Sequence, residues 1–358
     1  MNEHELAILR QFCLDAEPAS CTPYGCGHIN RTYLVATAGG RCYILQKINH
    51  HTFRDVAGLM ENIELVTEHL RRKSPDPRSV LTLIRTKDGK SYLEADDGYW
   101  RVFRFVEDSI CLQQPESDAD FYESAVGFGT FQQLLSDFPA EKLHETIPNF
   151  HNTPDRYRAF HETLTRDPMH RAAQVQPEIE FALARQAEMA ALQNALDAGE
   201  LPLRVTHNDT KLNNVLFDPE SGKAICVLDL DTVMPGLSAC DFGDAIRFGA
   251  STAAEDERDL DRVTIDLDMY RAFLRGYLDA CGDALTEKEI EVLPLSAKVI
   301  TGEIGLRFLK DHIDGDIYFG IQRPGQNLDR AHTQLKLVAE MEKKWDDMQR
   351  ILHEVTQK

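Results

Sequence analysis

Hydrophobic and polar residues alternate along much of the first hundred residues, which predicts β-strands joined by tight turns. The stretch "RTYLVATAGGRCYILQKI" has two β-rich runs on either side of Ala38-Gly39-Gly40, and it predicts a hairpin. A second stretch, "LTLIRTKDGKSYLEADDGYWRVFRFVE", repeats this pattern around two Asp-Gly turns. Between the two stretches, apolar residues recur with helical spacing from Val56 to Leu70, so we expect one helix there that ends at Ser74-Pro75.

The pattern changes after about residue 110, where apolar residues recur every three or four positions and predict helices. The main β signal of this second part is "NNVLFDPESGKAICVLDLD", two apolar runs on either side of a turn. We therefore predict an α+β fold with two lobes. Residues 1–106 would form a small β-rich lobe and residues 107–358 a larger, mainly helical one. A cleft between two such lobes is a common place for a ligand.

The composition of the chain limits the classes of function that it can have. The 358 residues carry a formal net charge of -20, which argues against binding nucleic acid or an anionic membrane through a basic surface. No apolar run approaches the roughly 20 residues of a membrane span. The eight cysteines form no Cys-x-x-Cys pair, and the first residues do not look like a secretion signal, so we expect a cytoplasmic protein with mostly buried, reduced thiols.

The stretch "VTHNDTKLNNVLFD" places short polar residues directly ahead of a strand. If the following hairpin turns between Glu220 and Ser221, then Asn214 lies opposite Val227. Because side chains alternate along a strand, Asn214 and Asp229 would share one face at the open end of the hairpin, roughly 7 Å apart. This inference depends on the register, because a slip of one residue would separate them.

These residue types suit phosphoryl transfer. An amide oxygen from Asn214 and a carboxylate from Asp229 are ligands that Mg²⁺ accepts. Asp209 would be a separate carboxylate directed at an acceptor hydroxyl, and Lys211 a cation that reaches the transferred phosphate. A glycine pair, Gly25 and Gly27, precedes the first hairpin, and such a turn can cover nucleotide phosphates with backbone N–H groups.

The motif "HNDTKLNN…VLDLD" resembles the catalytic loop and metal segment of the aminoglycoside phosphotransferase and choline kinase group, which is related to the protein kinases. The resemblance implies a protein-kinase-like fold that uses ATP and Mg²⁺, with Asp209 as catalytic base and Asp231 as a further candidate metal ligand beside Asp229. The literal "DFG" at Asp241 then looks like a decoy. Its aspartate stands where the family has a residue that braces the catalytic loop, although a helix N-cap explains Asp241 equally well.

The same resemblance assigns nucleotide contacts in the first lobe. The phosphate-binding lysine of the family falls on Gln46, while Lys47 is the obvious cation, and strand alternation lets only one of the two face the cleft. Glu64 on the following helix would be the usual partner of that cation. Phe105, Val106 and Glu107 resemble the hinge whose backbone reads adenine.

Longer strings, among them "PYGCGHINRTYLV", "FGDAIRFGASTAAEDE" and "RFLKDHIDGDIYFG", are similar to the bacterial N-acetylhexosamine 1-kinases. This resemblance covers nearly the whole chain. It implies ATP-dependent phosphorylation of the anomeric hydroxyl of N-acetylglucosamine or N-acetylgalactosamine. His28, Arg307 and Tyr318 are the candidate sugar contacts, and their ordinary alternatives are a turn histidine, a surface arginine in a salt bridge and a core tyrosine.

Two other functions stay open. The first is a sibling kinase that acts on choline, an amino alcohol or an aminoglycoside. The second is an inactive kinase-like binding module, against which the retention of Asp209, Asn214 and Asp229 argues. We expect a small-molecule sugar and ATP as partners, neither nucleic acid nor membrane, and a monomer ahead of an oligomer.

Overall fold

A computed structural model describes residues 3–25 and 29–357, and the chain divides into two compact units. The first unit consists of Met1–Cys111, Asp137–Pro148 and Val215–Pro235, and the second of Leu112–Ser136, Asn149–Asn214 and Gly236–Lys358. Each unit is thus built from segments that are distant in sequence. The compact units do not have the same boundaries as the predicted functional lobes 1–106 and 107–358. These lobes therefore remain a prediction.

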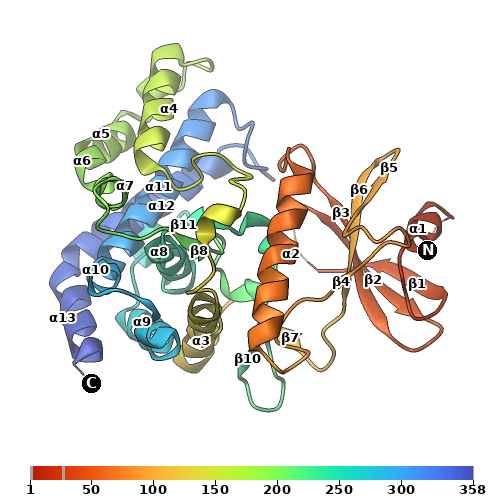
Figure 1. The fold of residues 1–358 in the computed structure, drawn as a ribbon. Helices are drawn as coiled ribbons and strands as arrows, with labels where there is room; N and C mark the ends of the chain where they lie inside the picture. Colours follow the sequence, from red (N-terminus) through yellow and green to blue (C-terminus); the bar gives the residue numbers. More distant parts are fainter. Residues whose placement is uncertain (1–2, 26–28, 358) are drawn as a thin grey trace. The chain divides into compact units, whose positions relative to one another are not determined.

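An antiparallel sheet of six strands forms most of the first unit, with the order β1-β2-β3-β6-β4 and β5 paired to β6 (Figure 1). Its strands are β1 (Pro18–Pro23), β2 (Arg31–Thr37), β3 (Cys42–Ile48), β4 (Leu83–Ile84), β5 (Leu93–Ala95) and β6 (Gly98–Arg104). The first predicted hairpin is confirmed as β2 and β3, and the Asp97-Gly98 turn of the second stretch joins the paired strands β5 and β6. The Asp88-Gly89 turn does not join a strand pair, because β4 pairs with β6 and not with β5. Gly40 and Gly89 each adopt a φ of 86° in the turns, a conformation that glycine accepts without strain.

Two helices lie on opposite faces of this sheet. Helix α1 (Glu3–Leu9) packs Ile8 and Leu9 into a core with Tyr43 and Leu45 of β3. Helix α2 (Val56–Lys73) ends at Ser74, as the Ser-Pro pair predicts, and it presents Met60 to the other face. Because side chains alternate along β3, residues 43, 45 and 47 face α1, whereas residues 44, 46 and 48 face α2.

A second, three-stranded sheet of the first unit contains β7 (Ile110–Cys111), β9 (Val215–Phe217) and β10 (Ala224–Val227). Near the turn, Ala224 pairs with Phe217. The register then shifts between Ala224 and Cys226, so that Val227 pairs with Val215. The predicted pairing of Val227 with Asn214 is therefore wrong by one residue. No pattern in the sequence indicates the shift in register. Strand β11 (Met234–Gly236) crosses the boundary, because the first unit ends at Pro235.

The second unit is mainly helical, apart from the short strand β8 (Arg204–Thr206). Its helices are α3 (Asp118–Leu134), α4 (Thr153–Arg166), α5 (Gln176–Ala184), α6 (Gln186–Met189), α7 (Ala191–Asp197), α8 (Ser238–Gly249), α9 (Leu267–Cys281), α10 (Glu287–Glu291), α11 (Leu293–Asp314), α12 (Gln326–Lys343) and α13 (Trp345–Thr356). The predicted α+β class, with a β-rich first part and a larger helical part, is confirmed. Within residues 3–25 and 29–357, no helix combines the length and apolarity that crossing a membrane requires.

The state and burial of the cysteines can be compared with the expectation from the sequence. All seven cysteines of the described residues are free thiols, and four of them are buried. Burial raises the pKa of Cys21 and of Cys226 to about 12, so both remain protonated and unreactive at neutral pH. The prediction of mostly buried, reduced thiols holds for this part of the chain.

Helices α3 and α9 approach each other closely because each contributes a glycine to their contact. A Cβ atom on Gly276 of α9 would lie 2.4 Å from the backbone oxygen of Tyr122 in α3. A Cβ atom on Gly129 of α3 would lie 2.7 Å from the backbone oxygen of Tyr277 in α9. Backbone atoms cannot move aside as a flexible side chain can, so the spacing of the two helices depends on these glycines.

We predict that Gly276→Ala lowers the free energy of unfolding by about 1–3 kcal/mol, because the added methyl group overpacks the helix contact. Urea denaturation followed by circular dichroism measures the change. Gly320→Ala is the matched control, since its Cβ atom would have no neighbour within 4 Å. A Gly276→Ala protein that unfolds at the same urea concentration as the wild type would show that the helices separate without loss.

Candidate functional site

The loop that follows β8 gathers three of the predicted functional side chains. Lys211 places its Nζ atom 2.8 Å from Oδ1 of Asp209. Asn214 donates from Nδ2 to the backbone oxygen of Asp209 at 2.7 Å and to its Oδ2 at 2.9 Å. Asn214 closes the 3₁₀ turn Leu212–Asn214 and is buried, whereas Asp209 and Lys211 keep about a third of their side chains exposed. The structure therefore brings these side chains together.

The charges of the loop are mutually stabilised. Burial opposes ionisation of Asp209, but the Lys211 ammonium and the Asn214 hydrogen bond outweigh it and hold the pKa of Asp209 below its ordinary value. The Asp209 carboxylate raises the pKa of Lys211 in turn, against the effect of burial. At neutral pH the loop thus presents an ionised carboxylate beside an ammonium group.

A buried carboxylate from α8 holds the backbone of this loop. Asp241 accepts hydrogen bonds from the backbone N–H groups of His207 at 2.8 Å and Asn208 at 2.7 Å. Gln132 of α3 donates to the same carboxylate at 3.0 Å and to the backbone oxygen of Val205 at 3.0 Å. Asn208 has a φ of 64°, a left-handed conformation that this anchoring maintains.

Of the two alternatives for Asp241, the structure supports the brace. Helix α8 begins at Ser238, so Asp241 lies inside its first turn and is not the N-cap. The neighbouring Phe242 packs against Phe273 and Tyr277 in the core. A Cβ atom on Gly243 would lie 2.5 Å from the backbone oxygen of Ser296 in α11. The "DFG" string thus serves loop anchoring and helix packing, as the decoy interpretation expects.

A second carboxylate of α8, that of Asp244, also holds the loop backbone and was not predicted from the sequence. Asp244 accepts from the backbone N–H of Thr210 at 3.1 Å and from Arg247 Nε at 3.0 Å. Arg247 is itself buried and reaches Glu255 at 2.8 Å. The signal was present in the string "DFGD", since two aspartates three positions apart lie on one side of a helix.

The predicted metal segment follows β10 in the first unit. Asp229 adopts a left-handed conformation with a φ of 52° and precedes the 3₁₀ turn Leu230–Thr232. Asn214 lies in a 3₁₀ turn ahead of β9, so strand alternation relates neither residue to the other. The predicted shared strand face of Asn214 and Asp229 is therefore wrong, while their roles as metal ligands remain a proposal. Among the described residues, no three His, Cys, Asp or Glu side chains form a metal-binding cluster.

Asp231 is buried and has two partners within the first unit. Its Oδ1 lies 2.5 Å from Nη1 of Arg101, and its Oδ2 accepts from Nδ2 of Asn30 at 2.5 Å. The side chains of Arg101 and Asp231 are only 2% and 3% exposed. Arg101 was missed in the sequence, where one arginine within a β-strand carries no distinguishing pattern.

The structure answers which of Gln46 and Lys47 faces α2. Lys47 lies on the α1 face, where its Nζ atom is 2.6 Å from Oδ2 of Asp97 and 5.5 Å from the centre of the Trp100 ring. Gln46 lies on the α2 face and accepts from Nε of Arg101 at 2.9 Å.

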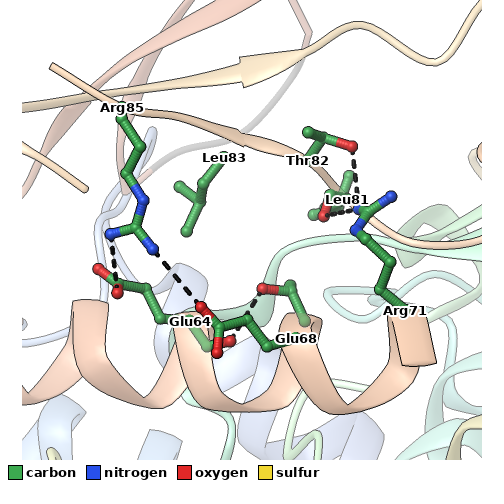
Figure 2. A pocket seen from close by; sticks show the side chains of 8 residues that line it. Glu64, Glu68, Arg71, Leu81, Thr82, Leu83 and Arg85 are labelled. Carbon is green, nitrogen blue, oxygen red and sulfur yellow. Dashed lines mark hydrogen bonds and ion pairs between the residues drawn. The ribbon is translucent and has the colours of Figure 1, made fainter. Parts of the chain in front are cut away.

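Glu64 has a partner other than the expected one. Figure 2 shows it in a shallow pocket beside α2, where its carboxylate lies 2.8 Å from Nη1 of Arg85. Glu68 also approaches this guanidinium, at 3.5 Å. The pairing of Glu64 with a cation of β3 is thus wrong in this structure.

The other predicted nucleotide contacts are backbone positions. Gly25 has a φ of 78° just after β1, which suits a glycine turn, whereas Gly27 and His28 lie outside the described residues. Strand β6 ends at Arg104, and the three predicted hinge residues follow directly. In that segment Phe105 donates its N–H to the backbone oxygen of Cys42 at 3.1 Å. The remaining hinge residues are Val106 and Glu107.

Two of the candidate sugar contacts, Arg307 and Tyr318, belong to an aromatic cluster in the second unit. The guanidinium of Arg307 in α11 lies 5.6, 5.8 and 5.4 Å from the ring centres of Phe150, Tyr318 and Phe319. Among the residues in ranges 3–25 and 29–357, no carboxylate forms an ion pair with Arg307. Tyr318 is 64% exposed, so neither the salt-bridged arginine nor the core tyrosine applies.

The loop that carries Tyr318 is held by a single carboxylate. Asp311 accepts the backbone N–H groups of Ile317, Tyr318 and Phe319 at distances between 2.8 and 3.0 Å. Asn327 of α12 also donates to this carboxylate at 2.9 Å. An exposed aromatic ring on a firmly anchored loop is a suitable platform for a ligand.

Comparison with known proteins gives the family. Residues 20–277 match the model of a phosphotransferase enzyme family, abbreviated APH. A microcompartment-associated aminopropanol kinase is 16% identical over 97% of this chain and 98% of its own, with a TM-score of 0.63. Choline kinase from Cryptosporidium parvum Iowa II is 12% identical, with coverages of 98% and 97% and a TM-score of 0.60. An amicoumacin kinase in complex with AMP-PNP, Ca²⁺ and Ami is 13% identical, with coverages of 96% and 94% and a TM-score of 0.60.

At these identities the structural likeness shows the fold, and it agrees with the protein-kinase-like architecture expected from the catalytic-loop motif. The family match spans well over half of the chain and includes the loop with Asp209 and the brace at Asp241. The chain belongs to the APH phosphotransferase enzyme family, and its fold is the protein-kinase-like fold of that family.

Proposed function

We propose that this protein is an N-acetylhexosamine 1-kinase, which transfers the γ-phosphoryl group of ATP to the anomeric hydroxyl of N-acetylglucosamine or N-acetylgalactosamine. The observation that carries the kinase chemistry is the contact of Asp209 with Lys211 and Asn214 on a loop braced by Asp241. The choice of sugar rests on the long strings similar to that branch of the family. The cluster around Arg307 supports it.

The donor set fits a divalent cation. Because Nδ2 of Asn214 is directed at Asp209, its Oδ1 points elsewhere and is the atom that a hard cation would contact. Asn214 and Asp229 would hold Mg²⁺, which would supply positive charge against the phosphate groups of the nucleotide. Both proposed ligands would offer oxygen atoms, which are the ligands that Mg²⁺ prefers.

The residues of the loop divide the chemistry. Asp209, ionised at neutral pH, accepts the proton of the anomeric hydroxyl. The sugar oxygen then bonds to the γ-phosphorus while the bond from that phosphorus to the β-phosphate oxygen breaks, and ADP leaves. Lys211 contributes positive charge beside the transferred group. The nucleotide would meet the glycine turn at Gly25 and the backbone of the hinge at Phe105.

The acceptor cluster favours a neutral sugar over a cationic alcohol. A cationic substrate such as choline would be repelled by the Arg307 guanidinium, whereas sugar hydroxyls and an acetamide oxygen can accept its N–H groups. The exposed Tyr318 ring offers a face on which a sugar can stack. A sibling kinase of an amino alcohol is the alternative, in keeping with the relatives of this fold. An assay of ATP consumption with Mg²⁺ across sugars and amino alcohols separates the two functions.

We predict that Asp209→Asn lowers kcat by about 10²–10⁴-fold, because the amide cannot accept the hydroxyl proton. The affinity for ATP should remain nearly unchanged. Steady-state kinetics with N-acetylglucosamine measure kcat, and calorimetry measures nucleotide binding. Asp261→Asn, which removes the same charge from a solvent-exposed position, should leave kcat intact. Wild-type turnover in Asp209→Asn would remove the general base from the mechanism.

We predict that Asp229→Ala raises the Mg²⁺ concentration needed for half-maximal activity by at least about tenfold, since a site with few protein ligands loses its carboxylate. The measurement is a Mg²⁺ titration at fixed ATP. Asp218→Ala, in the hairpin turn of the same segment, is the control. An unchanged titration in Asp229→Ala would place the cation elsewhere.

We predict that Tyr318→Phe and Arg307→Ala raise KM for the sugar, while KM for ATP stays constant. A lost hydrogen bond to an uncharged group is worth about 0.5–1.5 kcal/mol, so Tyr318→Phe should raise KM about two- to tenfold and Arg307→Ala more. Both constants should be measured with each hexosamine. Arg350→Ala, in an exposed ion pair of α13, is the matched control for the arginine. An increase in the ATP constant alone would assign these residues to the nucleotide.

A further inference from the structure

The resemblance to this kinase group puts Gln46 at the strand position of the phosphate-directed lysine. Gln46 carries no charge. Lys47 does not substitute for that lysine, because it belongs to the opposite face of the sheet and pairs there with Asp97. The triphosphate of a nucleotide still needs positive charge in its site, so the question is which residue supplies it.

Strand β6 places an arginine beside Gln46. In the register of β3 and β6, Gln46 lies directly opposite Arg101, and Lys47 lies opposite Trp100. Residues opposite each other in an antiparallel pair point to the same face. Arg101 therefore brings a guanidinium to the α2 face of the sheet, where its Nη1 atom is 3.9 Å from Sδ of Met60.

The guanidinium is held at two of its three nitrogens. Nε donates to Oε1 of Gln46 at 2.9 Å, and Nη1 lies 2.5 Å from Oδ1 of Asp231. Gln46 is fixed in turn, since its Nε2 donates to Oγ1 of Thr32 at 3.1 Å. In the described part of the chain, Nη2 makes neither a hydrogen bond nor an ion pair, so its two N–H groups remain as donors.

We propose that Arg101 is the phosphate-directed cation of this enzyme and replaces the β3 lysine of its family. Gln46 orients Arg101, and Asp231 balances its charge in the absence of nucleotide. This inference rests on the proposed kinase function and adds to it the residue that recognises the polyphosphate of a nucleoside triphosphate. It also gives Gln46 a role, because a lysine there would bring a second positive charge next to Arg101.

The Asp231 carboxylate is the partner in this arrangement and not a free ligand. Both of its oxygens are engaged, one by Arg101 and one by Asn30. Removing Arg101 alone would leave a buried carboxylate unpaired and endanger folding. A test of Arg101 therefore has to neutralise both charges together.

The experiment compares two ligands, adenosine and AMP-PNP with Mg²⁺, by calorimetry on the full-length protein. In the double variant Arg101→Gln/Asp231→Asn, we expect AMP-PNP to bind about 10–150-fold more weakly, the value of a hydrogen bond to a charged group. Adenosine, which has no phosphate, should bind within about twofold of the wild type. A merely structural role would alter both ligands alike.

A transposed variant and a control complete the design. Gln46→Lys/Arg101→Gln moves the cation to the opposite strand position and should recover most of the lost AMP-PNP affinity. Arg104→Gln removes the same charge from β6 at an exposed position on the other face, and should bind both ligands as the wild type does.

The outcomes separate this inference from the proposed function. If the double variant binds AMP-PNP as tightly as the wild type, or loses the same factor for adenosine, the role of Arg101 is overturned and the kinase function stands. If the wild type binds neither ligand and transfers no phosphate, the proposed function fails and this inference fails with it. If the double variant does not fold, the transposed variant provides the test. A transposed variant that folds but binds AMP-PNP no better than it binds adenosine overturns the proposed role of Arg101.

Discussion

The loop that carries Asp209 depends on one buried carboxylate. Asp241 accepts the N–H groups of His207 and Asn208, and without it two backbone donors would be buried unpaired beside a left-handed residue. Burial raises the pKa of Asp241, while its hydrogen bonds favour the ionised form. Its position is secured by α8, which packs against α11 at Gly243. The loop is thus held from behind by its backbone, and its side chains are left for chemistry.

The separate roles of backbone and side chains in this loop explain why so many polar residues directly precede β9. Asp244 anchors Thr210 as Asp241 anchors the preceding residues, so the polypeptide from 207 to 210 is fixed by two carboxylates of one helix. Asp209 and Lys211 then contact each other instead of the scaffold. An ionised carboxylate held beside an ammonium and an amide is preorganised, which is the main protein contribution to phosphoryl transfer.

The first unit shows how a sheet can relocate a charge. Opposite positions of paired strands share a face, so the side chain that a function requires can be delivered from either strand. Here Gln46 and Arg101 occupy one such pair, and the positively charged member lies on β6. The pairing of Glu64 with Arg85 fits this arrangement, since no lysine of β3 faces α2 to engage it.

The sequence by itself determined the α+β class, the first hairpin and the Asp97-Gly98 turn of the first unit, the end of α2 and the gathering of Asp209, Lys211 and Asn214, because these follow from local periodicity, turn residues and short spacing. Only the tertiary structure decided the irregularity before Cys226, which shifted the register of β9 and β10 and broke the argument for a shared strand face. It also decided the partners of Asp241, Arg101 and Glu64, which lie 34, 130 and 21 residues away from them in the chain (His207, Asp231 and Arg85). Such pairings depend on how strands and helices pack, and no local pattern encodes them. The sequence therefore indicated phosphotransferase chemistry, while packing selected which side chains meet.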